Sequence, residues 1–403
     1  MAFFFLLKYP HMEPKRFLIF HLDDGKELRG GQRQLLYLVK ELTKLGHLNR
    51  IVCRKGSPLE RTAGRKGFST ITLPYLFEWD PLSAFLLNRM IRAEAAACGY
   101  CEPPILHAHT SHAAAVSYLA SMNMPCVRIA HRRVDFVPSP GLSSKFKYEK
   151  AHRVIAISRP VKEIMLSLGL SENKISVVSS TVDLDETPWE NGGFPKYREA
   201  ARRAIARKFG IPPEAPWIGS VIALVPHKDP ENFVKAAALV TQKHPEARFL
   251  LAGAGELADS VRRLARVLNI EDRFHLLGYY DEPYELLSAL DIFVLPSSEE
   301  GMGSVLIEAM NSSLPIVATR AGGIIDVIED GANGLLVDVK DPEGLAAAQV
   351  ALLEDPPLRH RISEEGHRRR LDFSSPKMAE LTVKIYEQEL ARLKAIGADA
   401  ASA

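Results

Sequence analysis

Two glutamates, Glu300 and Glu308, stand with seven residues between them in a stretch that also carries a glycine turn. Gly301 and Gly303 lie between them, and a helix is predicted to begin near Ser304, a residue type that caps helix N-termini. The first N–H groups of a helix have no partner inside it and the helix dipole is positive there, so the turn suits a phosphate. Each carboxylate can accept hydroxyl groups of one sugar ring. The pattern therefore indicates a nucleotide-sugar site, the alternative being a capped helix with two surface glutamates. The N–H groups expected to be free are those of Ser304, Val305 and Leu306.

Short apolar segments alternate with longer amphipathic ones along the chain. Continuous apolar strands separated by helices are typical of parallel sheets covered on both faces, so two such series predict two doubly wound α/β domains. The segment 291–297 ends just before the glutamates, which places their loop at the carboxyl end of a strand, where such sheets bind ligands. Strands are predicted at 16–22, 49–54, 69–74, 105–109, 126–131, 153–158 and 175–179, and then at 217–225, 248–253, 274–280, 291–297, 315–319 and 334–338.

Several segments, taken in order, resemble one enzyme family. The glutamate stretch is similar to the E-x7-E signature of retaining glycosyltransferases with the GT-B fold, most of all glycosyltransferase family 4 (group 1 glycosyl transferases). Further segments that resemble this family are RGGQRQLLYLVKELTKLGH (29–47), IAISRPVKEIM (155–165), LLGYYDEPYELLSALDIFVLPS (276–297) and AGGIIDVIEDGANGLLV (321–337). The resemblance covers nearly the whole chain. It implies two Rossmann-like doubly wound domains that face each other across a cleft.

The resemblance, with a Pro-, Gly- and charge-rich seam at 182–200, implies the domain plan. Residues 1–185 would form an acceptor-binding N-terminal domain, 186–213 an interdomain linker and helix, and 214–375 the nucleotide-sugar-binding domain. A helix at 376–396 would cross back to the N-terminal domain. The implied enzyme is a hexosyltransferase that uses a UDP- or GDP-linked donor, a glycan, lipid-linked or lipopolysaccharide-type acceptor, no metal and no other cofactor.

The resemblance also assigns roles by position. Glu308 would bind the donor ribose, and Glu300 would contact the donor sugar and act in catalysis. Ser304 and Val305 would give backbone N–H groups to the phosphates. The remaining donor-binding residues implied are Gly301, Met302 and Gly303 in the turn, Gly278 and Tyr279 beside the base, and Gly30 and Gly31 in the other domain.

A departure from the family pattern concerns the cations that grip the diphosphate. The family usually carries an arginine and, five residues on, a lysine. The lysine is present as Lys228, but the arginine position is Ala223. Loss of one such cation weakens stabilisation of the leaving group by a few kcal/mol unless another residue replaces it. Arg132, Arg133 and His227 are the candidates for that replacement.

Basic side chains also follow two strands of the first domain. His107 and His109 fall on the same side of one strand, and by resemblance His109 faces the reacting sugar; the alternative is a hydrogen-bonded loop histidine. After the next strand, His131, Arg132 and Arg133 can hold an anionic acceptor, or they form a solvated loop.

Three patterns that suggest metals are given other interpretations. His107, His109 and His112 lack a carboxylate at ligand spacing. Asp183 and Asp185 match D-x-D, but they lie in the interdomain seam and are interpreted as linker residues. Cys98 and Cys101 have no second ligand pair, which argues against zinc.

The charge and the apolar segments of the chain limit the classes of partner that we expect. A net charge of +2 in 403 residues gives no electrostatic case for nucleic acid. The apolar run 2–7 is too short to span a bilayer and no basic residue precedes it, and Met12 is an alternative start. We expect a cytoplasmic protein, with peripheral contact to the inner face of the cytoplasmic membrane through the apolar run and the basic segment 54–68.

Two rival functions are compatible with the sequence. One is a GT-B synthase that acts on a soluble sugar or sugar-phosphate acceptor. The other is a catalytically weak nucleotide-sugar binding protein, which the alanine at position 223 favours.

Overall fold

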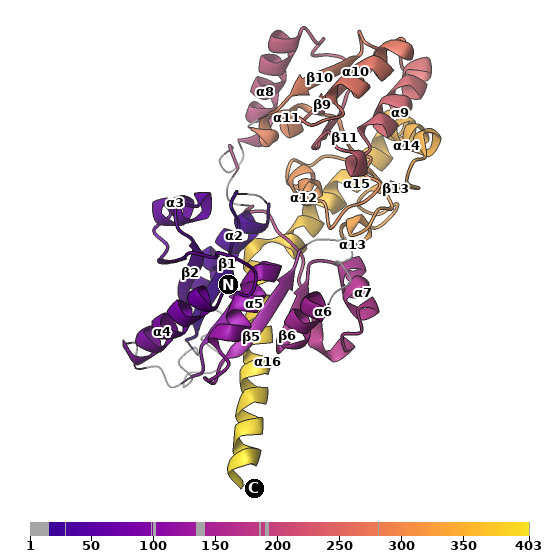
Figure 1. The fold of residues 1–403 in the computed structure, drawn as a ribbon. Helices are drawn as coiled ribbons and strands as arrows, with labels where there is room; N and C mark the ends of the chain where they lie inside the picture. Colours follow the sequence, from indigo (N-terminus) through magenta and orange to yellow (C-terminus); the bar gives the residue numbers. More distant parts are fainter. Residues whose placement is uncertain are drawn as a thin grey trace, which may run out of the picture.

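The computed structural model describes residues 16–402, except 29, 98, 100–101, 134–141, 185–186, 190–192 and 281. Two α/β domains follow each other along the chain, and the long C-terminal helix returns along the first of them (Figure 1). The apolar run 2–7, Met12, the Cys98–Cys101 pair and Asp185 lie outside the described residues.

The N-terminal domain is built on a parallel sheet of seven strands in the order β3-β2-β1-β4-β5-β6-β7. Every strand range expected in the first half of the sequence overlaps one of them, so the predicted doubly wound architecture is confirmed. The strands are β1 (Leu18–Asp23), β2 (Leu48–Arg54), β3 (Thr70–Leu73), β4 (Ile105–Ala108), β5 (Val127–Arg132), β6 (Arg153–Ala156) and β7 (Ile175–Val177).

Alternating side chains on these strands pack against helices on opposite faces. Leu18, Phe20 and Leu22 of β1 belong to the main apolar core, whereas Phe17 and Ile19 pack with residues of α2 and α16 on the other face. The period of two places each odd-numbered residue of β1, β4 and β5 on the α16 side. The helices of this half are α2 (Gly30–Lys44), α3 (Pro58–Arg65), α4 (Pro81–Ala97), α5 (Ser111–Ala120), α6 (Leu142–Glu149), α7 (Arg159–Ser167) and the 3₁₀ turn η1 (Glu172–Lys174).

The C-terminal domain repeats the plan with a parallel sheet of six strands in the order β10-β9-β8-β11-β12-β13. Its strands are β8 (Trp217–Val221), β9 (Arg248–Ala252), β10 (Phe274–Gly278), β11 (Ile292–Leu295), β12 (Ile316–Thr319) and β13 (Leu335–Val337). Its helices are η2 (Pro226–Lys228), α9 (Pro230–Lys243), α10 (Ala258–Val267), α11 (Pro283–Ala289), α12 (Ser304–Asn311), α13 (Ile324–Val327), α14 (Pro342–Glu354), α15 (Pro356–Arg369) and η3 (Arg370–Phe373).

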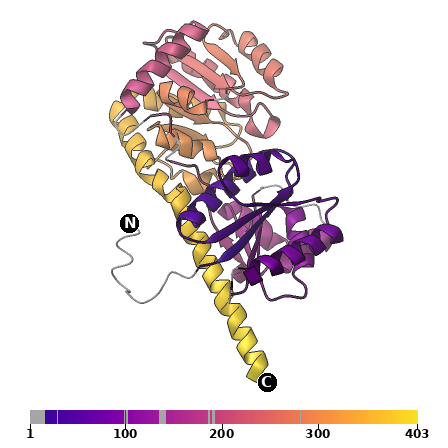
Figure 2. The same cartoon turned by 90° about the vertical axis from the view of Figure 1, so that its left-hand side faces the viewer.

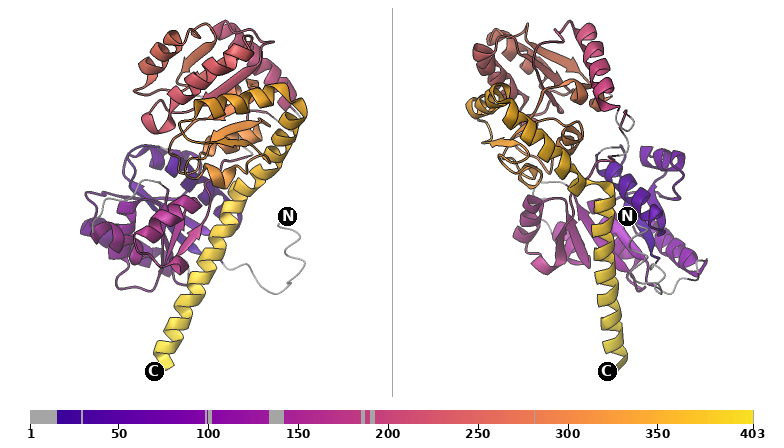
Figure 3. Two further views of the ribbon diagram at one scale, coloured as in Figure 1. Left: turned by 90° about the vertical axis from the view of Figure 1, so that its right-hand side faces the viewer. Right: turned by 180° about the vertical axis from the view of Figure 1, so that it is seen from behind.

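Two connections join the domains. Helix α8 (Phe194–Phe209) packs against α11 of the C-terminal domain, and Val182 pairs with Ser374 where the chain crosses and returns. Helix α16 (Ser375–Ser402) then runs beside α2, as the views in Figure 2 and Figure 3 show. Its residues Met378, Tyr386 and Leu390 are buried in the apolar cluster under the N-terminal sheet. Among the described helices, none has the length and apolar character needed to span a membrane.

Each sheet reverses its strand order at one point, between β1 and β4 in the first domain and between β8 and β11 in the second. Ligands of doubly wound folds bind outside the carboxyl ends of the strands at such a point. Gly30 and His109 follow β1 and β4, and Lys228 and Glu300 follow β8 and β11. These four predicted site residues therefore lie at the two switch points.

Candidate active site

The loop after β11, residues 296–303, carries Glu300 and leads into α12. Gly303 is the N-cap of this helix at φ +78°, so Ser304 is its first helical residue and the expectation that Ser304 caps it is wrong. The left-handed φ requires glycine at the cap. The N–H of Leu306 bonds to the carbonyl of Gly303 at 2.9 Å, which corrects the expectation that it is free. Ser304 and Val305 keep N–H groups that have no carbonyl partner within the helix.

A second glycine pair holds this loop in place. The N–H of Gly323 donates to the carbonyl of Glu300 at 2.7 Å. A Cβ added at Gly322 would lie 2.0 Å from the backbone carbonyl oxygen of Glu300, and one added at Gly323 would lie 2.1 Å from the backbone carbonyl oxygen of Gly301. The sequence analysis assigned no role to these two glycines, although the pair follows closely after the predicted strand 315–319.

Glu300 forms an ion pair with Lys228 across the switch point of the C-terminal sheet. The two loops are also joined through backbone, because the carbonyl of His227 accepts the N–H groups of Ser298 at 2.9 Å and Glu299 at 3.2 Å. Both charged side chains are mostly buried, at 11% exposed for Glu300 and 20% for Lys228. An acid and a cation are thus fixed at the start of the α12 turn.

Glu308 lies in a pocket between the domains. The pocket has a volume of about 180 Å³ and receives Ser304 and Glu308 from α12. Loss of solvation raises the pKa of Glu308 to about 7, while the positive charge of Arg33 acts in the opposite direction. The residues that line it from the other side are Leu28, Gly30, Arg33, Gln34, Tyr37, Thr181 and Val182.

Gly278 and Tyr279 lie at the carboxyl end of β10, two strands from β8. Gly278 has φ +75° and its carbonyl accepts the N–H of Gly253 at 2.8 Å. The Tyr279 ring is 74% exposed, which leaves a face available for stacking on a planar base.

Buried histidines occupy the α16 side of the N-terminal switch point. The rings of His107 and His109 stack with centroids 4.2 Å apart, and the His131 ring stacks on His107 at 5.5 Å. His107 Nδ1 lies 2.7 Å from the hydroxyl of Tyr386 on α16. His21 of β1 joins this group, with its Nδ1 3.1 Å from Nε2 of His109. The sequence analysis missed His21, whose odd-numbered place on β1 was the available signal.

The predicted acceptor residues follow this group. His131 and Arg132 are each 5% exposed, and Arg133 Nη2 donates to Nδ1 of His109 at 3.0 Å. A Cβ added at Gly31 would lie 3.6 Å from Cδ of Arg133. Arg133 thus stands beside the glycine turn of the N-terminal domain, while Ala223 is exposed after β8.

Ring nitrogens of His21, His107 and His109 lie within 4.8 Å of one another, close enough for a metal ion. Arg133 can only donate, so Nδ1 of His109 is an acceptor and the ring proton resides on Nε2. That proton already points to His21, so this arrangement offers no free lone pair on His109 Nε2. His112 instead pairs with Asp24 at 3.0 Å.

Asp183, one of the two D-x-D aspartates, forms an ion pair with Lys40 of α2. Its side chain is 1% exposed, so it serves the packing of the seam against the N-terminal domain.

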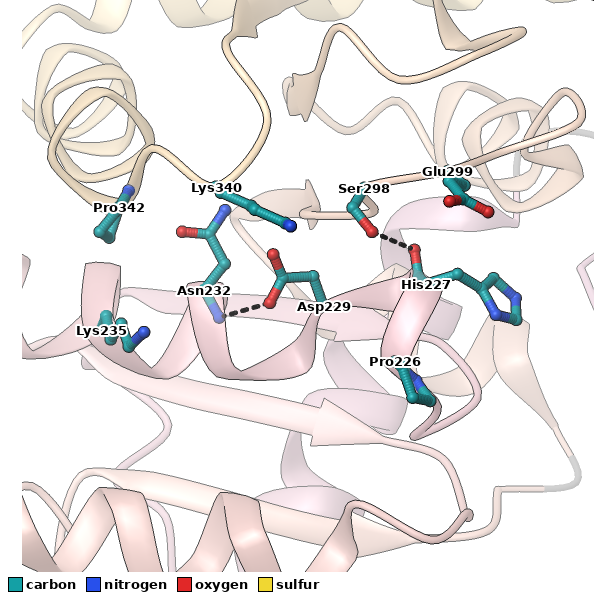
Figure 4. Close-up of a pocket in the computed structure, with 9 residues that line it drawn as sticks. All are labelled: Pro226, His227, Asp229, Asn232, Lys235, Ser298, Glu299, Lys340 and Pro342. Atoms are coloured by element: carbon teal, nitrogen blue, oxygen red, sulfur yellow. Dashed lines mark hydrogen bonds between the residues drawn. The ribbon is translucent and has the colours of Figure 1, made fainter.

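A larger pocket of about 560 Å³ lies on the C-terminal domain between η2, α9 and α14 (Figure 4). Asp229 and Lys340 contribute opposite charges to it, as do Glu299 and Lys235, so its lining does not select a ligand by charge. The His227 ring points away from its centre in Figure 4. Its lining residues are Pro226, His227, Asp229, Asn232, Lys235, Ser298, Glu299, Lys340 and Pro342.

Comparison with known proteins agrees with this geometry. Residues 28–186 match the model of Glycosyltransferase Family 4, and residues 201–369 match that of Glycosyl transferases group 1. The chain belongs to these glycosyltransferases, and its fold is GT-B.

Two relatives and one solved structure are similar to this chain over large parts of its length. A lipopolysaccharide core biosynthesis glycosyltransferase of Rhizobium meliloti is 35% identical over 40% of this chain and 46% of the relative. D-inositol 3-phosphate glycosyltransferase 2 of Catenulispora acidiphila is 31% identical over 62% of this chain and 58% of the relative. The chain thus spans about half the length of these two relatives. The structure of Anabaena HepE in complex with UDP has a TM-score of 0.76 at 18% identity, covering 92% of this chain and all of that one (100%).

Proposed function

We propose that this chain is a retaining glycosyltransferase that moves a hexose-type sugar from a nucleotide-sugar donor to a glycan, lipid-linked or lipopolysaccharide-type acceptor. The observation that carries the proposal is the interdomain pocket, in which Ser304 and Glu308 of one domain meet Gly30 of the other. The UDP bound to HepE, a protein of the same fold, supports a nucleotide-linked donor.

The proposed roles follow from chemistry at each position. The N–H groups of Ser304 and Val305 bind a phosphate, and Glu308 accepts hydroxyls from the ribose. Glu300 accepts hydroxyls from the transferred sugar, and Lys228 balances charge that develops on the diphosphate. The remaining donor contacts are proposed for Gly30, Gly31, Gly278, Tyr279, Gly301, Met302 and Gly303, and His109 faces the reacting sugar.

In the proposed reaction the bond between the anomeric carbon and the diphosphate oxygen breaks, and its electron pair stays on that oxygen. The acceptor hydroxyl oxygen bonds to the anomeric carbon from the same face and passes its proton to the departing diphosphate. Atoms and charge balance without a protein nucleophile or a metal ion.

Hydrolysis of nucleotide-sugars by the purified chain tests the proposal. After a thermal-shift panel of UDP-, GDP- and ADP-sugars selects a donor, slow release of free sugar is expected and Glu300→Ala should abolish it. Glu271→Ala is the matched control, because Glu271 is exposed at the amino end of the edge strand β10, whereas Glu300 follows the carboxyl end of the inner strand β11. Equal hydrolysis by the Glu300 variant would contradict the assigned role.

A catalytically weak nucleotide-sugar binding protein is the second candidate, and the exposed alanine at position 223 favours it. Thermal stabilisation by UDP or GDP, with no sugar released from any donor of the panel, would support the binder over the enzyme.

The proposed enzyme takes one of two classes of acceptor, either lipid-linked or soluble. One relative is named for lipopolysaccharide core biosynthesis and the other for D-inositol 3-phosphate, so lipid-linked and soluble phosphorylated acceptors both have support. Transfer of radiolabelled sugar to a lipid extract, compared with transfer to inositol phosphates, distinguishes them.

We also propose peripheral contact with an anionic membrane at the inner face of the cytoplasmic membrane. Exposed apolar side chains follow β3 and begin α4, and exposed basic residues lie in and directly after α3. Co-sedimentation with liposomes should increase with anionic lipid, and an unchanged pellet would count against the contact. The apolar residues are Leu76, Phe77, Leu82 and Phe85, and the basic ones are Arg61, Arg65 and the following Lys66.

A further inference from the structure

Arg133 lies between a glycine-containing loop of each domain. On the N-terminal side, its Cδ is 3.6 Å from the position of a Cβ added at Gly31. On the C-terminal side, its carbonyl oxygen is 3.7 Å from the position of a Cβ added at Gly301. Both distances are ordinary van der Waals contacts, so Arg133 lies directly against both glycine turns.

The guanidinium of Arg133 has neutral hydrogen-bond partners, and the carboxyl of Asp23 interacts with its charge without forming an ion pair. Its Nη2 donates to Nδ1 of His109 at 3.0 Å and to Nδ1 of His131 at 3.3 Å. Its Nε and Nη1 are buried, and within the described part of the chain they have no partner. No carboxylate of the described residues forms an ion pair with it.

The hydrogen bonds define which imidazole nitrogens carry protons. Because Nδ1 of His109 accepts from Arg133, its Nε2 carries the proton and donates to Nδ1 of His21 at 3.1 Å. His21 then donates from Nε2 to Oδ1 of Asn49 at 3.0 Å. The amide nitrogen of Asn49 donates to the carbonyl of His47 at 3.1 Å, which fixes the amide orientation. This series of hydrogen bonds thus runs from Arg133 through His109 and His21 to Asn49.

Each imidazole in this chain is neutral. Burial lowers the pKa of His21 to about 4 and holds the pKa values of His109 and His131 well below the usual range, with the charge of Arg133 acting in the same direction. The pKa of Arg133 is lowered to about 10 by burial, so the guanidinium stays charged at neutral pH. Neutral acceptors orient this cation without cancelling its charge, and a buried unpaired cation gains most from an anionic partner.

The other cation of the site is in a different state. The ammonium group of Lys228 is already paired with the carboxylate of Glu300, so part of its charge is compensated before any ligand binds. Two nitrogens of Arg133, Nε and Nη1, have no hydrogen-bond partner among the described residues, and no carboxylate there is paired with it.

We propose that Arg133 is a catalytic residue that holds the β-phosphate of the donor and supplies the positive charge that Ala223 lacks. This inference rests on the proposed function. As the bond from the anomeric carbon to the β-phosphate oxygen breaks, the electron pair stays on that oxygen, and Nε and Nη1 of Arg133 donate to the phosphate. The proton of the acceptor hydroxyl goes to the departing diphosphate. Arg133 therefore acts on the donor, in place of the acceptor role that the sequence suggested.

Calorimetric titration with UDP and UMP, with GDP and GMP in parallel, tests this assignment. Arg133→Gln should raise the Kd for the diphosphate by about 10- to 100-fold, the range expected for losing a charged hydrogen-bond pair. The Kd for the monophosphate should change less than about twofold. Arg133→Lys keeps the charge without the planar fork and should raise the diphosphate Kd by a smaller factor.

Arg128→Gln is the matched control, because Arg128 lies at the opposite end of β5 and stacks on Tyr118. It should bind both nucleotides as the unmodified protein does. The inference would be overturned if Arg133→Gln and Arg133→Lys both bound the diphosphate with the same Kd as the unmodified protein. If Arg133→Gln does not fold, unchanged diphosphate binding by Arg133→Lys alone overturns it. If the unmodified protein binds neither UDP nor GDP, the proposed function itself fails.

Discussion

Glu308→Gln should make the unliganded protein more stable at pH 8 and have a smaller stabilising effect at pH 5. The Glu308 carboxyl lies between α12 and the N-terminal domain, where burial raises its pKa to about 7. Glutamine keeps the shape and polarity of the protonated carboxyl but carries no charge to bury. The comparison therefore isolates the free energy of ionising this group in the folded state.

The magnitude follows from the difference between the folded pKa of about 7 and the pKa of 4.5 of a glutamate in water. At about 1.4 kcal/mol per pKa unit, the ionised form costs the fold about 3 kcal/mol at pH 8. Because the folded pKa is raised, the folded protein holds the proton longer, so its stability falls as pH rises from 4.5 to 7 and is level above that. At pH 5 the cost is about 1 kcal/mol.

Urea unfolding of both proteins at pH 5 and pH 8, followed by fluorescence, measures the difference. The variant should gain about 2 kcal/mol more at pH 8 than at pH 5, after allowance for the partial exposure of the side chain. In thermal unfolding, 1 kcal/mol corresponds to a shift of about 2–4 °C for a domain of this size.

Glu271→Gln serves as the control, because this side chain is exposed before β10, and it should change stability by less than about 0.5 kcal/mol at either pH. A Glu308 variant that is equally or less stable at pH 8 would refute the reasoning, since the carboxylate would then be stabilised by its surroundings.

Further predictions concern the loops and the returning helix. Lys228→Ala should lower donor turnover by about 10²–10³-fold in a coupled assay for the released nucleotide, because it removes a cation near the leaving group; an unchanged kcat would exclude that role. Gly323→Ala should destabilise the protein by at least about 2 kcal/mol and weaken UDP binding, since the new Cβ would lie 2.1 Å from the Gly301 oxygen; calorimetry and thermal unfolding would detect both effects, and a normal melting temperature would contradict the clash. Tyr386→Phe should cost about 1–2 kcal/mol in urea unfolding by leaving His107 Nδ1 without its partner at 2.7 Å, whereas a cost near zero would mean that the hydrogen bond is dispensable.

Local patterns made much of the fold predictable. The strands of both sheets were expected from apolar runs of the right length, and the doubly wound order follows from their alternation with helices. Lys228 was assigned to the diphosphate by resemblance, and its ion pair with Glu300 was not predicted. The cap at Gly303 was not predicted, because the preference of serine for N-caps competes with a turn that needs a left-handed residue.

What the sequence determined by itself is therefore the set of strands, the position of the glycine turn and the two glutamates around it, since these depend on residues close together in the chain. The electrostatic state of each group was decided only by the tertiary structure. Glu308 has a raised pKa because Leu28, Thr181 and Val182 of the other domain remove its solvent. Arg133 has no ion-pair partner among the described residues because β1, β4 and β5 bring neutral histidines to it, and Asp23 acts on its charge only without direct contact. Burial and pairing arise from neighbours that are distant in sequence, and no local pattern records them.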